Sequence, residues 1–457
     1  MPQHSDYWDP RNPVQKADRL RFHQRKRLIC GLHLSPDLSA IHGCLLQGQG
    51  AGKSLRVTPV QVDSLDIPSA ITDLLAQTLR GTHTPHNICR ETATDANTIG
   101  ADAPAPISEI CLPEEANCDL ATLQALQFDL TLLAETLLRQ LMCSAGQASD
   151  KVLAACLSDP GLLVHNETQW RTVPLLDAEA IAFSTGMNLI DQLASKDLLA
   201  GGQGWPLSAI PLWMIWGDRT HPVATQTRLL VELDECLLAT LLPPSDGLDA
   251  EFPEIEQTWA PGLQAIPAES RQSEPNFQRQ NKAVQELPRL WQELAAPATL
   301  SLHKDRFETL KSDAQQLADD LKNDPEQIRH LVPFWMTKLR PLIHKGLKRS
   351  ESLRIVLFAP PFWLTVLQEA LSHEFPQVLI SAATDFQCPQ QQHPAMVAAM
   401  HGFLHIDQMP CNLPWITGTD IPRILGRLVP GTPSRYRSLL VEMSDYRPPV
   451  MKLREAV

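Results

Sequence analysis

The chain has 457 residues, of which 43% are hydrophobic and 20% are charged, as is ordinary for a globular protein with one or two sizeable cores. Its formal net charge of −13 argues against a nucleic-acid-binding surface, because such a surface needs clustered lysine and arginine. The longest apolar uncharged run, 205–216, is shorter than the roughly 20 residues of a membrane-spanning helix. We therefore expect no nucleic-acid partner, no membrane partner, and two lobes or domains.

The ten cysteines show no Cys-x-x-Cys pair and no recurring spacing, which favours buried thiols over disulfides or a metal site. Residues 1–26 are polar with a basic end and lack the apolar stretch of a secretory signal. We therefore expect a cytoplasmic, reduced protein in which this segment is a solvated tail.

The first predicted elements form a hairpin that opens an α/β lobe. Apolar residues near Leu28 and at 41–46 flank a Ser-Pro-Asp turn at 35–37. The following segment, 48–54, ends in Gly-Lys-Ser like a phosphate-binding loop. However, Gln47 stands where the first glycine of that motif belongs, and the sequence continues as a strand rather than a helix. We interpret the segment as a hairpin turn, with nucleotide binding as the alternative.

Apolar residues recur at helical spacing over 119–142 and predict an amphipathic helix packed on a core. A second helix is expected near 148–157 and a short buried strand at 161–164. Ligands of open α/β sheets contact the carboxyl ends of parallel strands, so His165 and Glu167, which follow this strand, are candidate ligand contacts. For His165, a hydrogen-bonded structural role is the alternative.

The stretch 197–207 is the most distinctive part of the sequence. Gln203 is flanked by Gly201, Gly202 and Gly204, and the group lies between an acid and a proline. Glycines let the backbone pass very close to another group, so that an amide and a carboxylate are held nearby. The stretch suits a polar ligand or, equally, a tight turn without one.

Two parts of the chain carry a family resemblance. The run from Val164 to Leu207, VHNETQWRTVPLLDAEAIAFSTGMNLIDQLASKDLLAGGQGWPL, resembles the central segment of the anhydro-N-acetylmuramic acid kinase family, with its Ala-Ala-Gly-Gly-Gln-Gly-Ala-Pro-Leu motif. The run 410–431 resembles the closing Gly-Asn-Leu-Pro-x-Val-Thr-Gly-Ala, Val-Leu-Gly and Pro-Gly signature of that family. The resemblance implies an α/β fold with two RNase-H-like lobes of the sugar-kinase/actin ATPase superfold.

On this fold we place 27–225 in an N-terminal lobe that holds the sugar-side segment from His165 to Leu207. Residues 226–435 form a C-terminal lobe with a proline-rich insertion near 243–300, and 436–457 form a C-terminal tail. The other expected elements are helices at 281–294, 304–322 and 325–348 and strands at 354–357 and 439–442.

The resemblance implies that the family opens the anhydro ring of its sugar with water while phosphorylating it from Mg-ATP, in peptidoglycan recycling. This chemistry needs a carboxylate base for the water. By resemblance the catalytic candidates are Asp197, which matches the family motif, and Asp191, which lies one position from Gln192, where the family has an acid. The candidate substrate contacts are His165, Glu167, Gly201, Gly202, Gln203 and Gly204.

The nucleotide motifs of the family are altered together in this chain. The first phosphate motif falls on 31–40, where Gly31 and Ser35 are the remaining cofactor-binding candidates. There Ser39 replaces the acid, and Pro36 removes a backbone donor. No metal ligand set is predicted.

The second phosphate motif falls on 232–238 and places Glu232, Asp234 and Glu235 where a triphosphate would approach, which is electrostatically unfavourable. Residues 245–249 are a poor substitute for the motif that follows. The adenosine motif becomes 358–364, whose bulky side chains and prolines would fill a nucleotide slot.

We interpret the chain as a family member whose kinase activity is impaired or lost and which does not bind Mg-ATP. The alternatives are a divergent active kinase and a non-catalytic partner of an active paralogue. The expected ligand is an amino sugar or peptidoglycan fragment, and a homodimer or another protein partner is left open.

Overall fold

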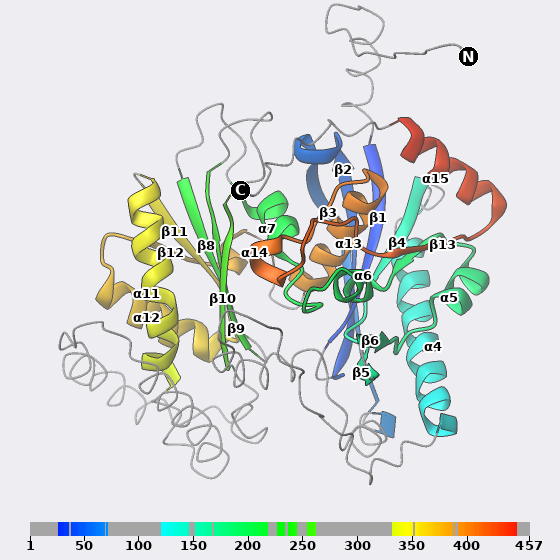
Figure 1. Ribbon diagram of the computed structural model, residues 1–457, viewed down its shortest axis with the longest axis horizontal. Coiled ribbons are helices and arrows are strands. Elements are labelled where there is room, and N and C mark those ends of the chain that lie inside the picture. Colours follow the sequence, from blue (N-terminus) through cyan, green and yellow to red (C-terminus); the bar gives the residue numbers. More distant parts are fainter. Residues whose placement is uncertain are drawn as a thin grey trace, which may run out of the picture. The chain divides into compact units, whose positions relative to one another are not determined.

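Figure 1 shows the computed structural model of the chain. The structure describes residues 26–35, 38–68, 70–71, 120–144, 146, 151–166, 169–217, 226–233, 236–244, 254–261, 331–350, 352–386, 388 and 392–445. These residues form two compact units, with boundaries after Ile215 and after His393. The first unit holds the described residues up to Ile215 and from Pro394 onward, and the second unit holds those from Trp216 to His393.

A six-stranded mixed sheet organises the first unit, in the order β13-β7-β4-β1-β2-β3. Strands β1, β2 and β3 are antiparallel neighbours, whereas β4 runs parallel to β1, and β7 runs parallel to β4. The strands are β1 (Lys26–Leu34), β2 (Ala40–Gln49), β3 (Arg56–Asp66), β4 (Val152–Ser158), β7 (Leu189–Asp191) and β13 (Arg427–Val429).

Helices pack on this sheet through apolar stripes. In α4 (Leu120–Ser144), Leu126, Leu130, Ala134, Leu137 and Leu141 recur every three or four residues and are fully buried, as the periodicity predicts. The other helices of this part of the chain are α5 (Ala178–Thr185), α6 (Leu193–Leu199), α7 (Ala209–Trp216), α13 (His393–Ile406), α14 (Pro414–Thr417) and α15 (Pro433–Asp445).

The second unit contains a five-stranded mixed sheet in the order β10-β9-β8-β11-β12. Here β8, β9 and β10 are antiparallel neighbours, β11 runs parallel to β8, and β12 runs parallel to β11. The strands are β8 (Gln226–Leu233), β9 (Cys236–Leu242), β10 (Glu256–Pro261), β11 (Ser352–Phe358) and β12 (Leu379–Ala382), and the helices are α11 (Leu331–Arg349) and α12 (Pro361–Glu374). Trp335 is fully buried in the core of this unit.

The two sheets repeat one topology. In each, the first three strands form an antiparallel meander, and the next two lie parallel on the other side of the first strand. The first sheet adds only β13 at its edge. This repeat confirms the predicted α/β class with two RNase-H-like lobes.

The turn between β2 and β3 is fixed by a buried ion pair. The guanidinium of Arg27 contacts both carboxylate oxygens of Asp407 and donates to the carbonyl oxygen of Gly50 over 2.7 Å. Asp407 also accepts from the backbone N–H of Gly52 over 2.7 Å. The Gly-Lys-Ser sequence forms a single 3₁₀ turn at Gly52–Ser54 and leads into β3, so the hairpin interpretation is confirmed.

Some predicted elements were wrong. Residues 152–158 form the strand β4 rather than a helix, because this apolar run lies between two parallel neighbours in the sheet. The predicted strand at 439–442 lies inside the helix α15. The expected strand at 161–164 exists as β5 (Leu162–Asn166), but it pairs antiparallel with β6 (Gln169–Val173) in a separate hairpin and not in the parallel sheet.

The unit boundaries also differ from the predicted ones. From Pro394 onward the chain lies in the first unit, because β13 pairs with β7 there. The predicted helices at 281–294 and 304–322, the segment 245–249 and most of the proline-rich insertion lie outside the described residues.

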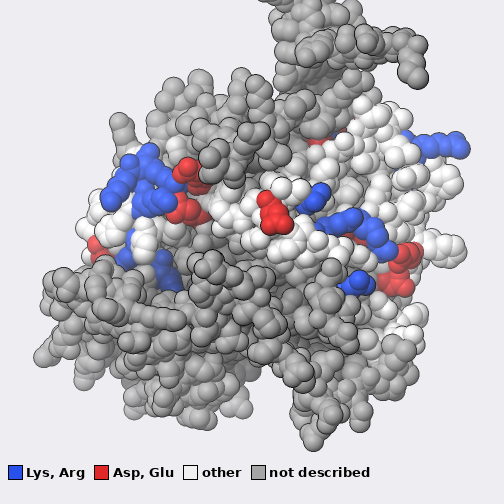
Figure 2. All heavy atoms as spheres, viewed as in Figure 1, with Lys and Arg blue, Asp and Glu red and all other residues white. Residues whose placement is uncertain are grey.

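No helix among the described residues is long and apolar enough to cross a membrane. On the face drawn in Figure 2, lysine and arginine side chains of the described residues lie beside aspartate and glutamate side chains.

Candidate functional site

The two segments that carry the family resemblance meet at the carboxylate of Asp197. This residue lies in α6, and its side chain is fully buried. One carboxylate oxygen accepts from the side-chain amide of Asn412 over 2.7 Å, and the other accepts from the backbone N–H of Gly204 over 2.8 Å. The backbone N–H of Gln203 donates to the carbonyl oxygen of Thr417 over 2.9 Å. The glycine-rich turn and the closing segment are therefore one site.

Steric constraints explain why this turn contains glycine. A Cβ atom on Gly202 would lie 2.2 Å from the Oδ2 atom of Asp197 and 2.5 Å from a methyl carbon of Thr419. Gly201 and Gly204 have φ angles of 82° and 74°, which other residues rarely adopt. The turn therefore needs glycine to wrap around Asp197, while the side chain of Gln203 remains exposed to solvent.

The closing segment folds around Asn412, a residue that the sequence analysis did not single out. Its side-chain oxygen accepts from the backbone N–H of Arg423, and its amide nitrogen lies 3.3 Å from the hydroxyl of Thr419. Asn412 is 1% exposed. Its place in the Cys-Asn-Leu-Pro sequence was the signal that could have identified it.

Burial sets the acidity of Asp197. Desolvation raises the pKa of this carboxyl above its ordinary value, while hydrogen bonds from Asn412, Gly204 and Thr417 oppose the increase. A carboxyl held in this way is oriented by three donors from two distant segments. It has the character of a general base or acid, although its oxygens are engaged by neighbours within the protein.

Asp191 lies at the carboxyl end of β7 and is held by Arg427. The two carboxylate oxygens of Asp191 accept from Nε and Nη2 of Arg427 over 3.1 and 2.7 Å. Arg427 also contacts Glu179 over 2.8 Å, and these two acids raise the pKa of the guanidinium. This bidentate ion pair engages both carboxylate oxygens of Asp191 within the protein.

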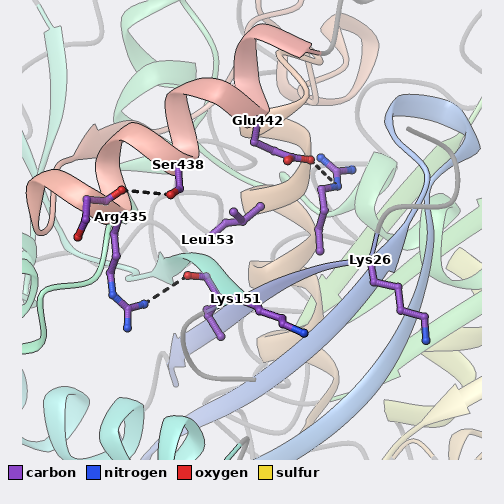
Figure 3. Close-up of a pocket in the computed structure, with 9 residues that line it drawn as sticks. Lys26, Lys151, Leu153, Arg435, Ser438 and Glu442 are labelled. Atoms are coloured by element: carbon purple, nitrogen blue, oxygen red, sulfur yellow. Dashed lines mark hydrogen bonds and ion pairs between the residues drawn. The ribbon is translucent and has the colours of Figure 1, made fainter. Parts of the chain in front are cut away.

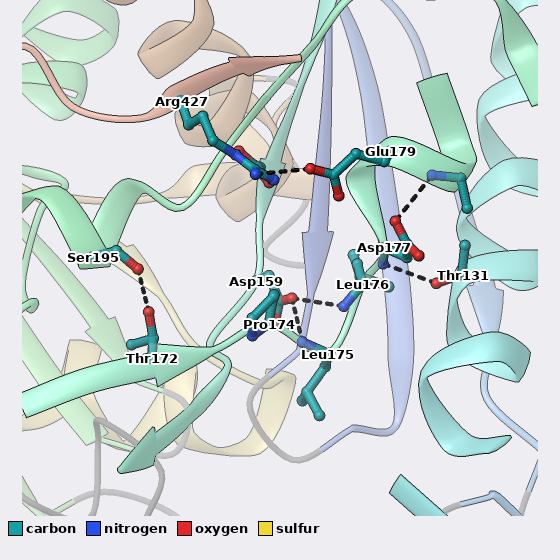
Figure 4. Close-up of polar contacts among 12 residues, drawn as sticks. Thr131, Asp159, Thr172, Pro174, Leu175, Leu176, Asp177, Glu179, Ser195 and Arg427 are labelled. Atoms are coloured by element: carbon teal, nitrogen blue, oxygen red, sulfur yellow. Dashed lines mark hydrogen bonds and ion pairs between the residues drawn. The ribbon is translucent and has the colours of Figure 1, made fainter. Parts of the chain in front are cut away.

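Asp159 follows β4 and was missed by the sequence analysis. Its carboxylate accepts from the backbone N–H groups of Gly161, Leu175 and Leu176 over 2.8, 2.7 and 2.8 Å (Figure 4). These contacts join the two ends of the β5–β6 hairpin. Desolvation by burial raises the pKa of Asp159 to about 6, although the three backbone donors oppose the increase.

The remaining sugar-side candidates lie on or beside the β5–β6 hairpin. His165 pairs through its backbone with Trp170, and its position at the end of a parallel strand was wrongly predicted, because β5 belongs to a separate antiparallel hairpin. Glu167 lies outside the described residues. The hydroxyl of Thr172 on β6 contacts the hydroxyl of Ser195 on α6 (Figure 4), so the hairpin and the Asp197 helix are in contact.

The two cofactor-binding candidates occupy structural positions. A Cβ atom on Gly31 would lie 2.0 Å from the carbonyl oxygen of Ala395, so this glycine allows β1 and α13 to pack closely. The hydroxyl of Ser35 accepts from the backbone N–H of Ala40 and donates to its carbonyl oxygen, over 3.0 and 2.9 Å. These contacts account for both residues without a phosphate.

In the second unit, Glu232 at the start of the second phosphate motif contacts a histidine. The carboxylate of Glu232, at the end of β8, lies 3.1 Å from Nδ1 of His393. The indole N–H of Trp216 donates to Nε2 of the same histidine over 2.9 Å. This geometry fits a neutral imidazole with its proton on Nδ1. Asp234 and Glu235 lie outside the described residues.

The adenosine-motif segment belongs to the core of the second unit. Phe358 is 2% exposed and stacks on the ring of His393, with ring centroids 4.2 Å apart. Trp363 is 6% exposed and packs edge-on against Trp335. Two of the bulky side chains at this motif are therefore buried in packing contacts.

The phosphate-side residues do not fit Mg-ATP. The described part of the chain contains no group of three histidine, cysteine or acidic residues that could hold a metal ion. Glu232 contributes negative charge at the end of β8, and the hydroxyl of Ser35 is engaged within its own turn. We therefore derive no step through this cofactor.

Comparison with known protein families gives a match to part of the chain. The model of the anhydro-N-acetylmuramic acid kinase family matches residues 86–224, which is less than half of the chain and includes α6 and the glycine-rich turn. No curated protein matches the chain. Residues 86–224 are therefore similar in sequence to the anhydro-N-acetylmuramic acid kinase family, within a fold of two RNase-H-like lobes.

Proposed function

We propose that this protein binds an amino sugar or peptidoglycan fragment beside Asp197 and that its phosphoryl transfer is impaired or lost. The family match supports a kinase function at the level of the family. The resemblance of the chain to this family implies that the family reaction is ATP-dependent ring opening and phosphorylation of anhydro-N-acetylmuramic acid. The proposal goes beyond the family match in one respect, namely that this reaction is impaired or lost in the present chain.

The contact between Glu232 and His393 carries this proposal. It holds a carboxylate at the end of β8, at the first position of the segment 232–238 that the family resemblance aligns with a phosphate motif. Two unit charges 4 Å apart repel by about 4 kcal/mol at the effective dielectric constant near a protein surface. A repulsion of this size opposes nucleotide binding at this position.

On the sugar side, the site retains groups that bind a hydroxyl-rich ligand. The exposed amide of Gln203 supplies one acceptor and two donors, and its backbone is anchored to Thr417. Asp197 orients the turn through Gly204. In this proposal Gln203 contacts the sugar, and Asp197 holds the turn or accepts a proton from a bound water.

Substitution of Gln203 tests the sugar side without disturbing the fold. Because its side chain is exposed, Gln203→Ala should keep the unfolding temperature of the free protein while weakening the binding of anhydro-N-acetylmuramic acid by about tenfold, the equivalent of 1.4 kcal/mol. Gln140→Ala, an exposed glutamine on α4, is the matched control. Equal calorimetric affinities in wild type and Gln203→Ala, or no binding by wild type, would contradict this part of the proposal.

A divergent active kinase is the second candidate, because the family match itself favours it. It predicts release of ADP and a phosphorylated sugar from Mg-ATP and anhydro-N-acetylmuramic acid. The product should be measured by ³¹P NMR with Asp197→Asn as the negative control. Sugar-phosphate formation by wild type but not by this variant would replace the proposed function with the active kinase.

A further inference from the structure

A second polar pocket lies at the opposite edge of the first sheet from Asp191 and Asp159. Those two acids follow the carboxyl ends of β7 and β4, whereas Lys26 begins β1 and Lys151 directly precedes β4. Since β1 and β4 are parallel neighbours, with Leu28 opposite Val152, both lysines lie at the same edge of the sheet. Helix α15 lines one side of the pocket (Figure 3). The cavity volume is about 600 Å³.

Positive charge dominates the lining. Lys26, Arg27, Lys151 and Arg435 line the pocket together with a single acid, Glu442. Arg27 is paired with Asp407 and also lies 3.7 Å from Glu442, so the exposed basic side chains of the lining are the two lysines. Within the described part of the chain, neither lysine forms an ion pair. In a protein with a net charge of −13, such a local excess of cations is a specific feature.

The geometry presents these charges to the cavity. Lys26 and Lys151 are exposed and extend from adjacent strand starts, while Arg435 projects from the first turn of α15 (Figure 3). Nη1 of Arg435 lies 3.4 Å from the carbonyl oxygen of Val152 and 2.8 Å from the sulfur of Met187. Ser434 and Ser438 add hydroxyls to the same wall.

We propose that this pocket binds a small phosphorylated metabolite, separately from the sugar site. Lysine and arginine donors with neighbouring hydroxyls are the groups that bind phosphate oxygens. The cavity volume falls in the range of pockets that hold small molecules, roughly 300–1,000 Å³. The buried cluster of Arg27, Asp407 and Glu442 forms the base of the site and connects it to the β2–β3 turn through Gly50 and Gly52.

Calorimetric titration of the full chain with inorganic pyrophosphate at constant ionic strength tests this proposal. We expect wild type to bind, and Lys26→Ala and Lys151→Ala each to weaken the affinity by about tenfold, as for the loss of one charge-assisted hydrogen bond. Lys348→Ala removes an exposed lysine of α11 in the second unit and should leave the affinity unchanged. Neither lysine is buried, so the variants should fold.

The alternative outcomes are distinct. No binding of pyrophosphate by wild type at millimolar concentration would overturn the proposal, as would equal affinities in the two pocket variants and the control. Binding of citrate in preference to pyrophosphate would contradict the phosphorylated class of ligand. The test does not depend on the sugar or nucleotide site, because both lysines lie at the amino ends of the strands.

Discussion

Asn412 donates a hydrogen bond to the buried carboxylate of Asp197 over 2.7 Å, although 215 positions separate the two residues. This contact joins the glycine-rich turn after α6 to the segment that follows α13. It lies within one unit, so the site does not depend on how the two units are arranged. The contact makes both segments parts of one folded structure around the same carboxylate.

Removing the side-chain amide of Asn412 should destabilise the protein. Asn412→Ala leaves a buried carboxylate oxygen without its donor, and the loss of a hydrogen bond to a charged group costs roughly 1.5–3 kcal/mol. Asn412→Asp should cost more at neutral pH, because it places a second carboxylate against Asp197. Urea unfolding measures both. Asp420→Asn, an exposed change in the same segment, is the control, and equal unfolding free energies in Asn412→Ala and the control would contradict the assigned contact.

Alanine at Gly202 should be more harmful than alanine at Gly201. At Gly202 the added Cβ atom would lie 2.2 Å from Oδ2 of Asp197, whereas at Gly201 it meets nothing within 4 Å and only the φ angle of 82° is unfavourable. We expect a loss of about 1 kcal/mol for Gly201→Ala and more for Gly202→Ala. Adding Asp197→Ala to Gly202→Ala removes the clash with Asp197 but not the contact with Thr419, so the combined loss should be smaller than the sum of the two single losses. Additive losses would argue against the clash.

The ionisation of Asp159 should make stability depend on pH. Burial raises its pKa from 3.8 to about 6, so the folded protein holds this proton more tightly than the unfolded chain does. The contribution of Asp159 to stability is therefore greatest below pH 3.8 and decreases as the pH rises through 6, by up to about 3 kcal/mol. Asp159→Asn should remove this dependence. A difference in unfolding free energy between wild type and variant that stays constant from pH 4 to 7 would disprove it.

Arg427 should matter more to stability than its partner Glu179. Arg427→Ala leaves the buried carboxylate of Asp191 without its guanidinium, at a cost of about 1–3 kcal/mol. Glu179 is 64% exposed, so Glu179→Ala should cost less than about 1 kcal/mol. Chemical unfolding of the two variants provides the comparison, and equal losses would show that Asp191 does not need this partner.

Local sequence patterns predicted the elements whose periodicity or turns are unambiguous. The leucines of 120–144 predicted α4, and the Ser-Pro-Asp turn predicted the β1–β2 hairpin, because both signals depend on neighbouring residues. The run 152–158 was misassigned because a short apolar segment fits a helix or a strand equally well. Its pairing with β1 and β7 decides the outcome, and this pairing is not encoded locally.

The candidate site was predicted in part. Asp197 and the glycines were found from composition and resemblance, but their partner Asn412 is far away in the sequence. His393 was missed for the same reason, since its contacts with Glu232 and Trp216 arise only in the folded second unit. Among the described side chains of α15 only Leu439 and Glu442 are buried, and the apolar Leu-Leu-Val run suggested a strand where a helix forms.

A thermal-shift titration of the full chain with Mg-ATP, run beside one with anhydro-N-acetylmuramic acid, tests the central claim most directly. A ligand that binds only the folded protein raises its unfolding temperature by mass action. We predict an increase with the sugar, reduced in Gln203→Ala, and no increase with Mg-ATP. A clear increase with Mg-ATP in the wild type would contradict the loss of nucleotide binding inferred from Glu232, His393 and Phe358.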